Sequence, residues 1–250
     1  SFDTFIRFSN GKSDRDNDAD AHGMAIKLMD VEGEKLLDDE KGTQDFILAD
    51  HPVFFARNIE HMNAFVIAFG QNTSIEEILK THPVLESFKK LPKASPLESQ
   101  YWSQTPYLLG ECAARYSVIP AQANCSGKDP ADSDNFLQEA LIEFLTDREA
   151  RFDFFVQLQV DPNSMDIEDP TLSWDECDSP PIKVATIIIP KQKFDSPSQM
   201  AFCEALSFNP WHSLPEHRPL GGINRARRVI YQDSSELRHA KYEPTGKEQF

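Results

Sequence analysis

The sequence predicts an α+β protein built on an antiparallel β-sheet with its helices packed outside the sheet. About seven short runs have strand character, and helical segments of unequal length lie between them. No regular strand–helix–strand rhythm, which would indicate a parallel sheet, is present, so an antiparallel sheet, open or closed, is favoured. With 250 residues, 40% of them hydrophobic, the chain is long enough to bury a substantial core. We interpret residues 1–250 as a single domain.

The first half of the chain predicts three strands followed by two helices. The strands, identified by alternating apolar residues, are 2–9, 23–31 and 44–50, the last resuming at 53–56 after Pro52. Apolar residues at helical spacing predict a helix over 58–69. Ser74-Ile75-Glu76-Glu77 is a capping box, which predicts a second helix that ends near His82 or, past Pro83, near Lys90.

The second half predicts four further strands, at 106–109, 113–119, 152–160 and 182–189. The run 182–189 is rich in β-branched residues, which is typical of a buried strand. Helices are predicted at 135–146 and from Ser196-Pro197 to Leu206. The segment 208–220 carries three prolines and is expected to be an extended, wrapping loop before a final helix.

Charge and motifs exclude several classes of function. The formal net charge of -16 opposes binding to nucleic acid or to an anionic membrane surface, because the phosphate attraction would be repulsive. No apolar run approaches the roughly 20 residues that span a bilayer. The sequence contains no GxGxxG, GxxxxGK[ST], HExxH or GxSxG, and its four cysteines form no CxxC pair. The chain therefore lacks the motifs of dinucleotide-binding proteins, nucleoside triphosphatases, zinc proteases and α/β-hydrolases.

The final helix, which begins at Gly221-Gly222, carries the strongest candidate chemistry. Four residues advance a helix by about 400° and seven by about 700°, so Arg227, Tyr231 and Arg238 share one stripe. Two guanidinium neighbours favour the charged form of a phenol, and a phenolate is a hard ligand suited to ferric iron. The alternative is a solvated basic helix whose tyrosine packs on the core.

The chain begins without a methionine and enters its first strand at once, so we expect a fragment. Its compartment stays open, with the cytoplasm as the default.

Several segments, in order and spacing, resemble the catalase family. They are Arg7-Phe8-Ser9, residues 20–27, residues 50–58, Phe208-Asn209-Pro210, and Arg227-x-x-x-Tyr231-x6-Arg238. The stretch from Glu34 to Arg238, including Gln192-x-Phe194 and Pro210-Trp211-His212, is more closely similar to short catalase-related proteins. The resemblance covers nearly the whole chain and implies a catalase-like β-barrel that holds haem b.

The resemblance also implies a role for each of seven residues. Tyrosine is the known haem ligand of catalases, so Tyr231 is expected to ligate ferric iron, with Arg227 holding the phenolate ionised. Arg7 and Arg238 are expected to meet haem propionates, which arginine binds bidentately. Phe208 is placed on the proximal side of the haem, and Phe54 and Met62 on the distal side.

The sequence departs from the family pattern at two distal positions. The family's catalytic histidine lies upstream of the Arg-Phe-Ser strand, and this chain begins six residues before Arg7. We therefore expect an N-terminal segment to be missing. The distal asparagine falls at Asp50, or at Ala49 if no gap is allowed. Asp50 can accept a hydrogen bond or, when protonated, donate one, so it is the remaining catalytic candidate.

The resemblance implies a haem-dependent oxidoreductase whose partner is a small peroxide, by dismutation or peroxidation. An alternative with the same fold is a fatty-acid hydroperoxide-converting enzyme of the allene oxide synthase type, with which a changed distal amide is compatible. A third reading is a non-catalytic haem-binding fragment. No nucleic acid and no membrane span are expected, and a homo-oligomer is allowed.

Overall fold

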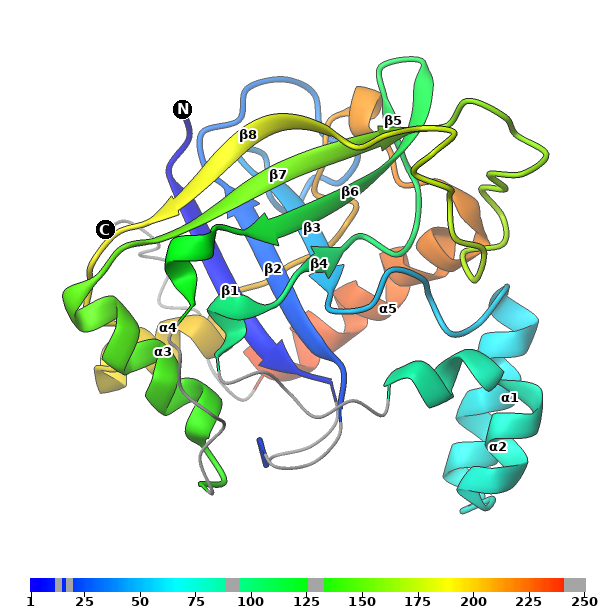
Figure 1. Ribbon diagram of the computed structural model, residues 1–250, viewed down its shortest axis with the longest axis horizontal. Helices are drawn as coiled ribbons and strands as arrows, with labels where there is room; N and C mark the ends of the chain where they lie inside the picture. The colour runs from blue at the N-terminus through cyan, green and yellow to red at the C-terminus, as the bar shows by residue number, and fades with distance from the viewer. Residues whose placement is uncertain (12–14, 17–19, 89–94, 126–132, 241–250) are drawn as a thin grey trace.

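A computed structural model of the chain describes residues 1–11, 15–16, 20–88, 95–125 and 133–240. One eight-stranded antiparallel sheet forms its centre, with the order β1-β2-β3-β4-β6-β7-β8 and with β5 paired to β6 (Figure 1). The strands are β1 Thr4–Asn10, β2 His22–Leu28, β3 Gln44–Ala49, β4 Tyr101–Trp102, β5 Tyr107–Leu109, β6 Cys112–Pro120, β7 Ala150–Leu158 and β8 Ile182–Ile189. The predicted antiparallel α+β class is confirmed.

The sheet curls into a half-barrel. Its described pairings run from β1 at one edge to β8 at the other, and no described pairing joins these two strands. The closed barrel expected from the family resemblance is therefore not what the described strands form. Figure 1 shows β6, β7 and β8 arching over β1, β2 and β3.

The concave face of the sheet holds the core. On β2 the side chains of Met24 and Ile26 point into it, and both are buried. Tyr116 and Phe154 come from the opposite half of the sheet, and Phe46 packs edge-on against both. Alternation along each strand leaves the intervening side chains on the convex face.

Among the described residues, five α-helices lie outside the sheet: α1 Ile59–Gly70, α2 Ile75–Thr81, α3 Phe136–Asp147, α4 Pro197–Ala205 and α5 Gly221–His239. The Ser74 hydroxyl accepts from the Glu77 amide, which confirms Ser74 as the N-cap that the predicted capping box requires. After α2, residues Pro83–Phe88 form a 3₁₀ helix, and the predicted alternative end at Lys90 lies outside the described residues. Figure 1 shows α1 and α2 on one side of the molecule and α3 and α4 on the other. None of the described helices combines the length and apolar character needed to cross a bilayer.

The strands differ from the prediction in three respects. The third strand ends at Ala49 and does not resume after Pro52, where the chain only bends. The two-residue strand β4 was not predicted, because so short a run carries no period. The prediction that 182–189 is buried is wrong: its apolar residues Ile182, Val184 and Ile188 are 55%, 56% and 53% exposed. β8 is an edge strand with β7 as its described neighbour, which explains this exposure.

Helix α5 begins at a position that requires glycine. Gly221 has φ +82°, and a Cβ there would lie 2.3 Å from the carbonyl oxygen of Ile167. L-residues rarely adopt this backbone conformation, and the contact leaves no room for a side chain. The start of α5 is thereby fixed against the connection that precedes β8. This contact sets where the helix enters the fold.

Candidate functional site

The predicted Arg227–Tyr231 pair is formed on α5. Arg227 Nη2 donates a hydrogen bond of 2.9 Å to the hydroxyl oxygen of Tyr231, and the guanidinium carbon lies 5.0 Å from the Tyr231 ring centroid. The other terminal nitrogen, Nη1, donates to Thr105 Oγ1 at 3.2 Å and to Asn224 Oδ1 at 3.1 Å. One guanidinium therefore bridges the phenol of α5 and the segment between β4 and β5.

Asn224 fixes the position of this guanidinium. Its side chain is fully buried, and its Nδ2 donates to the carbonyls of Pro106 and Leu220, both at 2.9 Å. Thr105 Oγ1 donates to Asn224 Oδ1 at 3.0 Å, and Trp211 Nε1 donates to the Asn224 carbonyl at 2.7 Å. Every polar group of the Asn224 side chain is thus satisfied in one rotamer. Arg227, one helical turn later, is held in register with Tyr231.

The charge of Arg227 is strongly favoured in this environment. Burial acts against the cation, but the nearby phenols of Tyr231 and Tyr107 outweigh it and hold the pKa of Arg227 above its ordinary value. Burial raises the pKa of Tyr107 in turn. Arg227 therefore presents a permanent positive charge to the Tyr231 hydroxyl oxygen.

A second group joins Arg7, Phe208 and Arg238. The guanidinium carbon of Arg7 lies 5.6 Å from the centroid of the buried Phe208 ring. Arg238 Nη2 donates to the carbonyl of Leu206 at 3.0 Å. Burial lowers the pKa of Arg238, and the charge of Arg7 lowers it further, so the two guanidiniums are close enough to repel each other. The structure thus brings these three predicted residues together.

The convex face of the sheet beside Arg7 is lined by small residues. Arg7 pairs with Ala25 and Ser9 with Gly23 across β1 and β2, and Gly23 pairs with Ala49 on β3. These residues point away from the face that carries Met24 and Ile26. A flat group could therefore lie against this part of the sheet.

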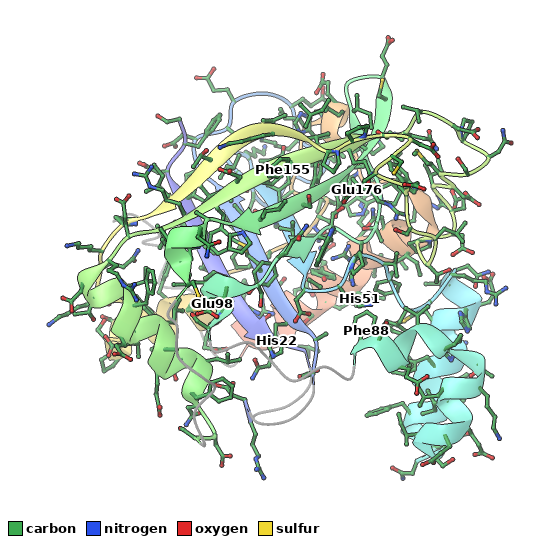
Figure 2. All side chains as sticks on the ribbon, in the orientation of Figure 1. His22, His51, Phe88, Glu98, Phe155 and Glu176 are labelled. Carbon is green, nitrogen blue, oxygen red and sulfur yellow. The ribbon has the colours of Figure 1, made fainter. Side chains whose placement is uncertain are left out.

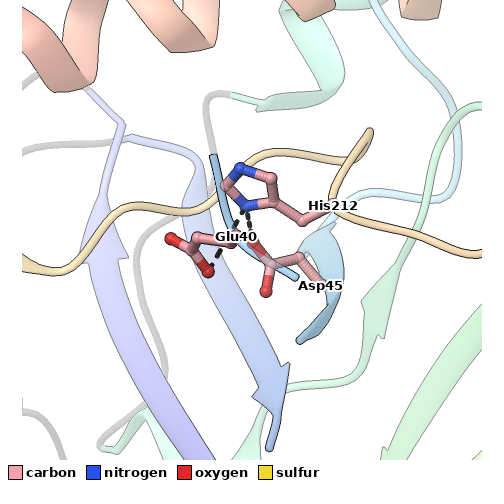
Figure 3. A group of neighbouring side chains, drawn as sticks. All are labelled: Glu40, Asp45 and His212. Carbon is pink, nitrogen blue, oxygen red and sulfur yellow. Dashed lines mark hydrogen bonds and ion pairs between the residues drawn. The ribbon is translucent and has the colours of Figure 1, made fainter. Parts of the chain in front are cut away.

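A buried ion-pair network adjoins this group, and Figure 3 shows part of it. Lys27 Nζ bonds the carboxylates of Glu40 and Asp45, the latter at 2.9 Å. Asp45 Oδ2 lies 2.8 Å from His212 Nδ1, and His212 Nε2 lies 3.1 Å from Asp39 Oδ2. The side chains of Lys27, Asp45 and His212 are 2%, 0% and 0% exposed. Such charges are stable in the interior only as partners.

The network fastens the segment that carries Phe208 to the sheet. Asp45 Oδ2 also accepts from the Asn209 amide at 2.9 Å, and the Asp45 amide donates to the His212 carbonyl at 2.9 Å. Lys27 Nζ lies 5.5 Å from the Phe208 ring centroid, and Arg7 contacts the same ring. Asp45 therefore joins β3 to the loop that leads into α5.

Glu40, Asp45 and His212 have potential ligand atoms within 4.8 Å of one another, which is the spacing of a metal site. The ammonium of Lys27 already bonds both carboxylates. It supplies the positive charge that a metal ion would supply. We therefore assign this cluster as an ion-pair network.

The three predicted distal residues are not brought to the Tyr231 group by any described contact. Asp50 accepts from the His22 amide, and its Oδ2 lies 2.8 Å from His22 Nδ1. His22 shares the face of β2 that carries Met24, and Figure 2 shows it at one end of the sheet. Phe54 lies beside Phe55, with ring centroids 4.7 Å apart and the rings tilted by 30°. Met62 lies half-buried on α1.

The residues present fit the two anionic groups of a haem. Arg238 Nε is buried and has no hydrogen-bond partner among the described residues. Within the same residues, no carboxylate lies at ion-pair distance from Arg7 or Arg238. Two neighbouring cations without an acid are suited to a carboxylate ligand. The donor set is therefore compatible with propionates, and the phenol of Tyr231 with ferric iron.

Sequence reasoning missed the residues that support the predicted ones. They are Lys27, Asp45, Thr105, His212 and Asn224. Asn224 precedes Arg227 by one helical turn, and this spacing could have predicted that the two side chains are neighbours. Lys27 is a cation in the middle of an apolar strand, which also signals a buried partner. Thr105, Asp45 and His212 carry no local signal.

Solved structures of catalases have the same fold as this chain. A fungal catalase has a TM-score of 0.74 and 17% identity, with 98% of this chain and 53% of that chain covered. Catalase A from Saccharomyces cerevisiae gives 0.73 and 17%, covering 94% and 53%. A bacterial catalase gives 0.72 and 16%, covering 96% and 51%. At this identity the similarity concerns the fold alone. It confirms the catalase-like fold that the sequence resemblance implied.

The chain spans about half the length of these catalases. The sequence matches no protein-family model and no curated protein.

Proposed function

We propose that this chain is the haem-binding core of a peroxide-converting oxidoreductase. The observation that carries the proposal is the hydrogen bond from Arg227 to the Tyr231 hydroxyl, held in place by the buried Asn224. The neighbouring pair of arginines without an acid partner adds to it. The catalase fold supports placing these groups around one cofactor.

Each residue has a distinct role in this proposal. When bound, ferric haem b supplies the redox chemistry of peroxide cleavage. Tyr231 Oη would hold the iron, and Arg227, which donates to that oxygen, would favour its anionic form. Arg7 and Arg238 would bind the propionates. Phe208, kept in place by the Asp45 network, forms the wall beside them.

The distal assignments Asp50, Phe54 and Met62 remain predictions. The Asp50 carboxylate accepts from the His22 amide and lies 2.8 Å from His22 Nδ1, and its remaining lone pairs stay available for a peroxide proton. An acid in place of the family's distal amide is compatible with the second candidate function, the conversion of a fatty-acid hydroperoxide.

Haem titration of charge variants tests the cofactor site. We expect Arg7→Gln and Arg238→Gln each to weaken haem binding about tenfold, because each removes a charge-assisted pair. Arg225→Gln is the matched control, since Arg225 lies on the same helix but pairs with Glu168 at the surface. Equal haem affinity in all four proteins would contradict the proposed site.

Turnover assays on the haem-loaded chain separate the candidate activities. Oxygen release from hydrogen peroxide above that of free haem supports the leading function. Consumption of a fatty-acid hydroperoxide without oxygen release supports the second. Haem binding with neither activity identifies a non-catalytic haem-binding chain and rejects both enzyme proposals.

A further inference from the structure

A cavity of about 440 Å³ lies on the convex side of the sheet, and none of the residues of the groups described above lines it. It lies between β4, β6 and the connection that leads to β8. Trp102, Gln104, Arg115, Gln157, Trp174 and Glu176 are among its lining residues, and Tyr231 is not. Figure 2 labels Glu176 on this connection. The volume falls in the range of small-molecule sites, about 300 to 1,000 Å³.

Arg115 is the group that makes this cavity more than a gap in packing. It is 6% exposed, and its guanidinium carbon lies 4.6 Å from the Trp174 ring centroid. Nη1 donates to the Leu172 carbonyl at 2.7 Å. Nε and Nη2 are buried and have no hydrogen-bond partner among the described residues. The same holds for Nε1 of Trp174, which is 3% exposed.

The free donors form a recognisable pattern. Nε and Nη2 are the two nitrogens on one edge of a guanidinium, and their N–H bonds run parallel. That edge binds the two oxygens of a carboxylate with two parallel hydrogen bonds. The hydrogen bond to Leu172 and the stacking on Trp174 hold the guanidinium in place, so little side-chain entropy is lost on binding.

We propose that this cavity binds a compact organic monocarboxylate. Its carboxylate meets the Nε–Nη2 edge of Arg115 and the indole N–H of Trp174. Its apolar body lies against Trp102 and the prolines at positions 52 and 181, which also line the cavity. This site is independent of the proposed haem function, since it shares no residue with it.

The charges around the cavity favour a single negative charge on the ligand. Burial lowers the pKa of Arg115 to about 10, and Asp169 only partly opposes this effect. Arg115 therefore remains a cation at neutral pH, and no described carboxylate forms an ion pair with it. Asp175 and Glu176 also line the cavity, and they would repel a dianion such as phosphate.

Tryptophan fluorescence and calorimetry with cyclohexanecarboxylate test the proposal. The chain has three tryptophans, two of which line the cavity, and the probe does not absorb their light. We expect saturable binding of cyclohexanecarboxylate, and at least tenfold weaker binding of the neutral cyclohexanecarboxamide and of phosphate. Equal binding of acid and amide by the unmodified protein would overturn the proposal without any variant.

Variants then locate the site. Arg115→Gln is expected to weaken binding at least tenfold, and Arg115→Lys, which keeps the charge but loses the parallel donors, several-fold. The matched control is Arg148→Gln, because Arg148 also lies over an aromatic ring, Phe144, but is exposed at the end of α3 and does not line the cavity. Trp174→Phe removes one donor and is expected to weaken binding severalfold. Binding that is unchanged in folded Arg115→Gln, or reduced as much in Arg148→Gln, would contradict the assignment.

Discussion

At the scale of single residues, Asp45 does the most to connect distant parts of the chain. Its carboxylate meets Lys27 from β2, and the Asn209 amide and His212 from the loop before α5. Each of these groups would otherwise be a buried, unpaired charge or donor. Removing the carboxylate therefore leaves several penalties at once.

We expect Asp45→Ala to lower the free energy of unfolding by about 3 to 5 kcal/mol, as when one partner of a buried ion pair is removed. Asp39→Ala serves as the control. Asp39 contacts the same His212, but its side chain is 48% exposed, so its loss should cost at most about 1 kcal/mol. Urea denaturation measures both. Equal losses would show that the interior network is no more important than its surface end.

His212 makes part of this stability depend on pH. Burial alone would lower the pKa of His212, but the hydrogen bond and charge of Asp45, together with Glu40, outweigh it and raise the pKa above the ordinary 6.5. The folded protein then binds more protons than the unfolded chain in that window, so stability falls as pH rises.

We therefore expect the stabilisation from protonated His212 to be complete below about pH 6.5 and to disappear as pH rises through the folded-state pKa. The measurement is the difference in unfolding free energy between the natural protein and His212→Gln across this range. A difference that grows with pH would contradict the assigned direction.

At the scale of elements, α5 is positioned by its first residue as much as by its packing. Gly221→Ala should lower the free energy of unfolding by about 2 to 4 kcal/mol, because it combines a left-handed backbone with a contact to the Ile167 carbonyl. Gly42→Ala is the matched control, since a Cβ at Gly42 meets nothing within 4 Å. Thermal unfolding of both variants checks this. A loss in Gly221→Ala no larger than in the control would contradict the account.

The sequence predicted most elements because their signals are local. The N-cap at Ser74 and the glycine start of α5 have short-range physical causes, and both predictions are confirmed. The burial of β8 was predicted wrongly because a β-branched run looks the same in an edge strand as in a central one. Strand position is set by pairing, which a single strand does not encode.

At the scale of the whole molecule, the sequence indicated the fold class and half of the candidate site. The stripe of Arg227 and Tyr231 was predictable because helical periodicity relates residues close in the sequence. The hydrogen bond between Asp45 and His212, which supports the site, joins residues 167 positions apart, and no local sequence pattern predicts it. The sheet curls, but no described pairing joins β1 to β8. This too is a property of the assembled strands and not of any single one.

The most direct test of the central claim is the absorption spectrum of the haem-loaded protein with and without the Tyr231 phenol. We expect Tyr231→Phe to change the ferric spectrum and weaken haem binding, because the variant removes the proposed iron ligand. Tyr101→Phe, which removes a phenol whose hydroxyl donates to the Pro96 carbonyl in the core, should leave the spectrum unchanged. Identical ferric spectra for the natural protein and Tyr231→Phe would contradict the account.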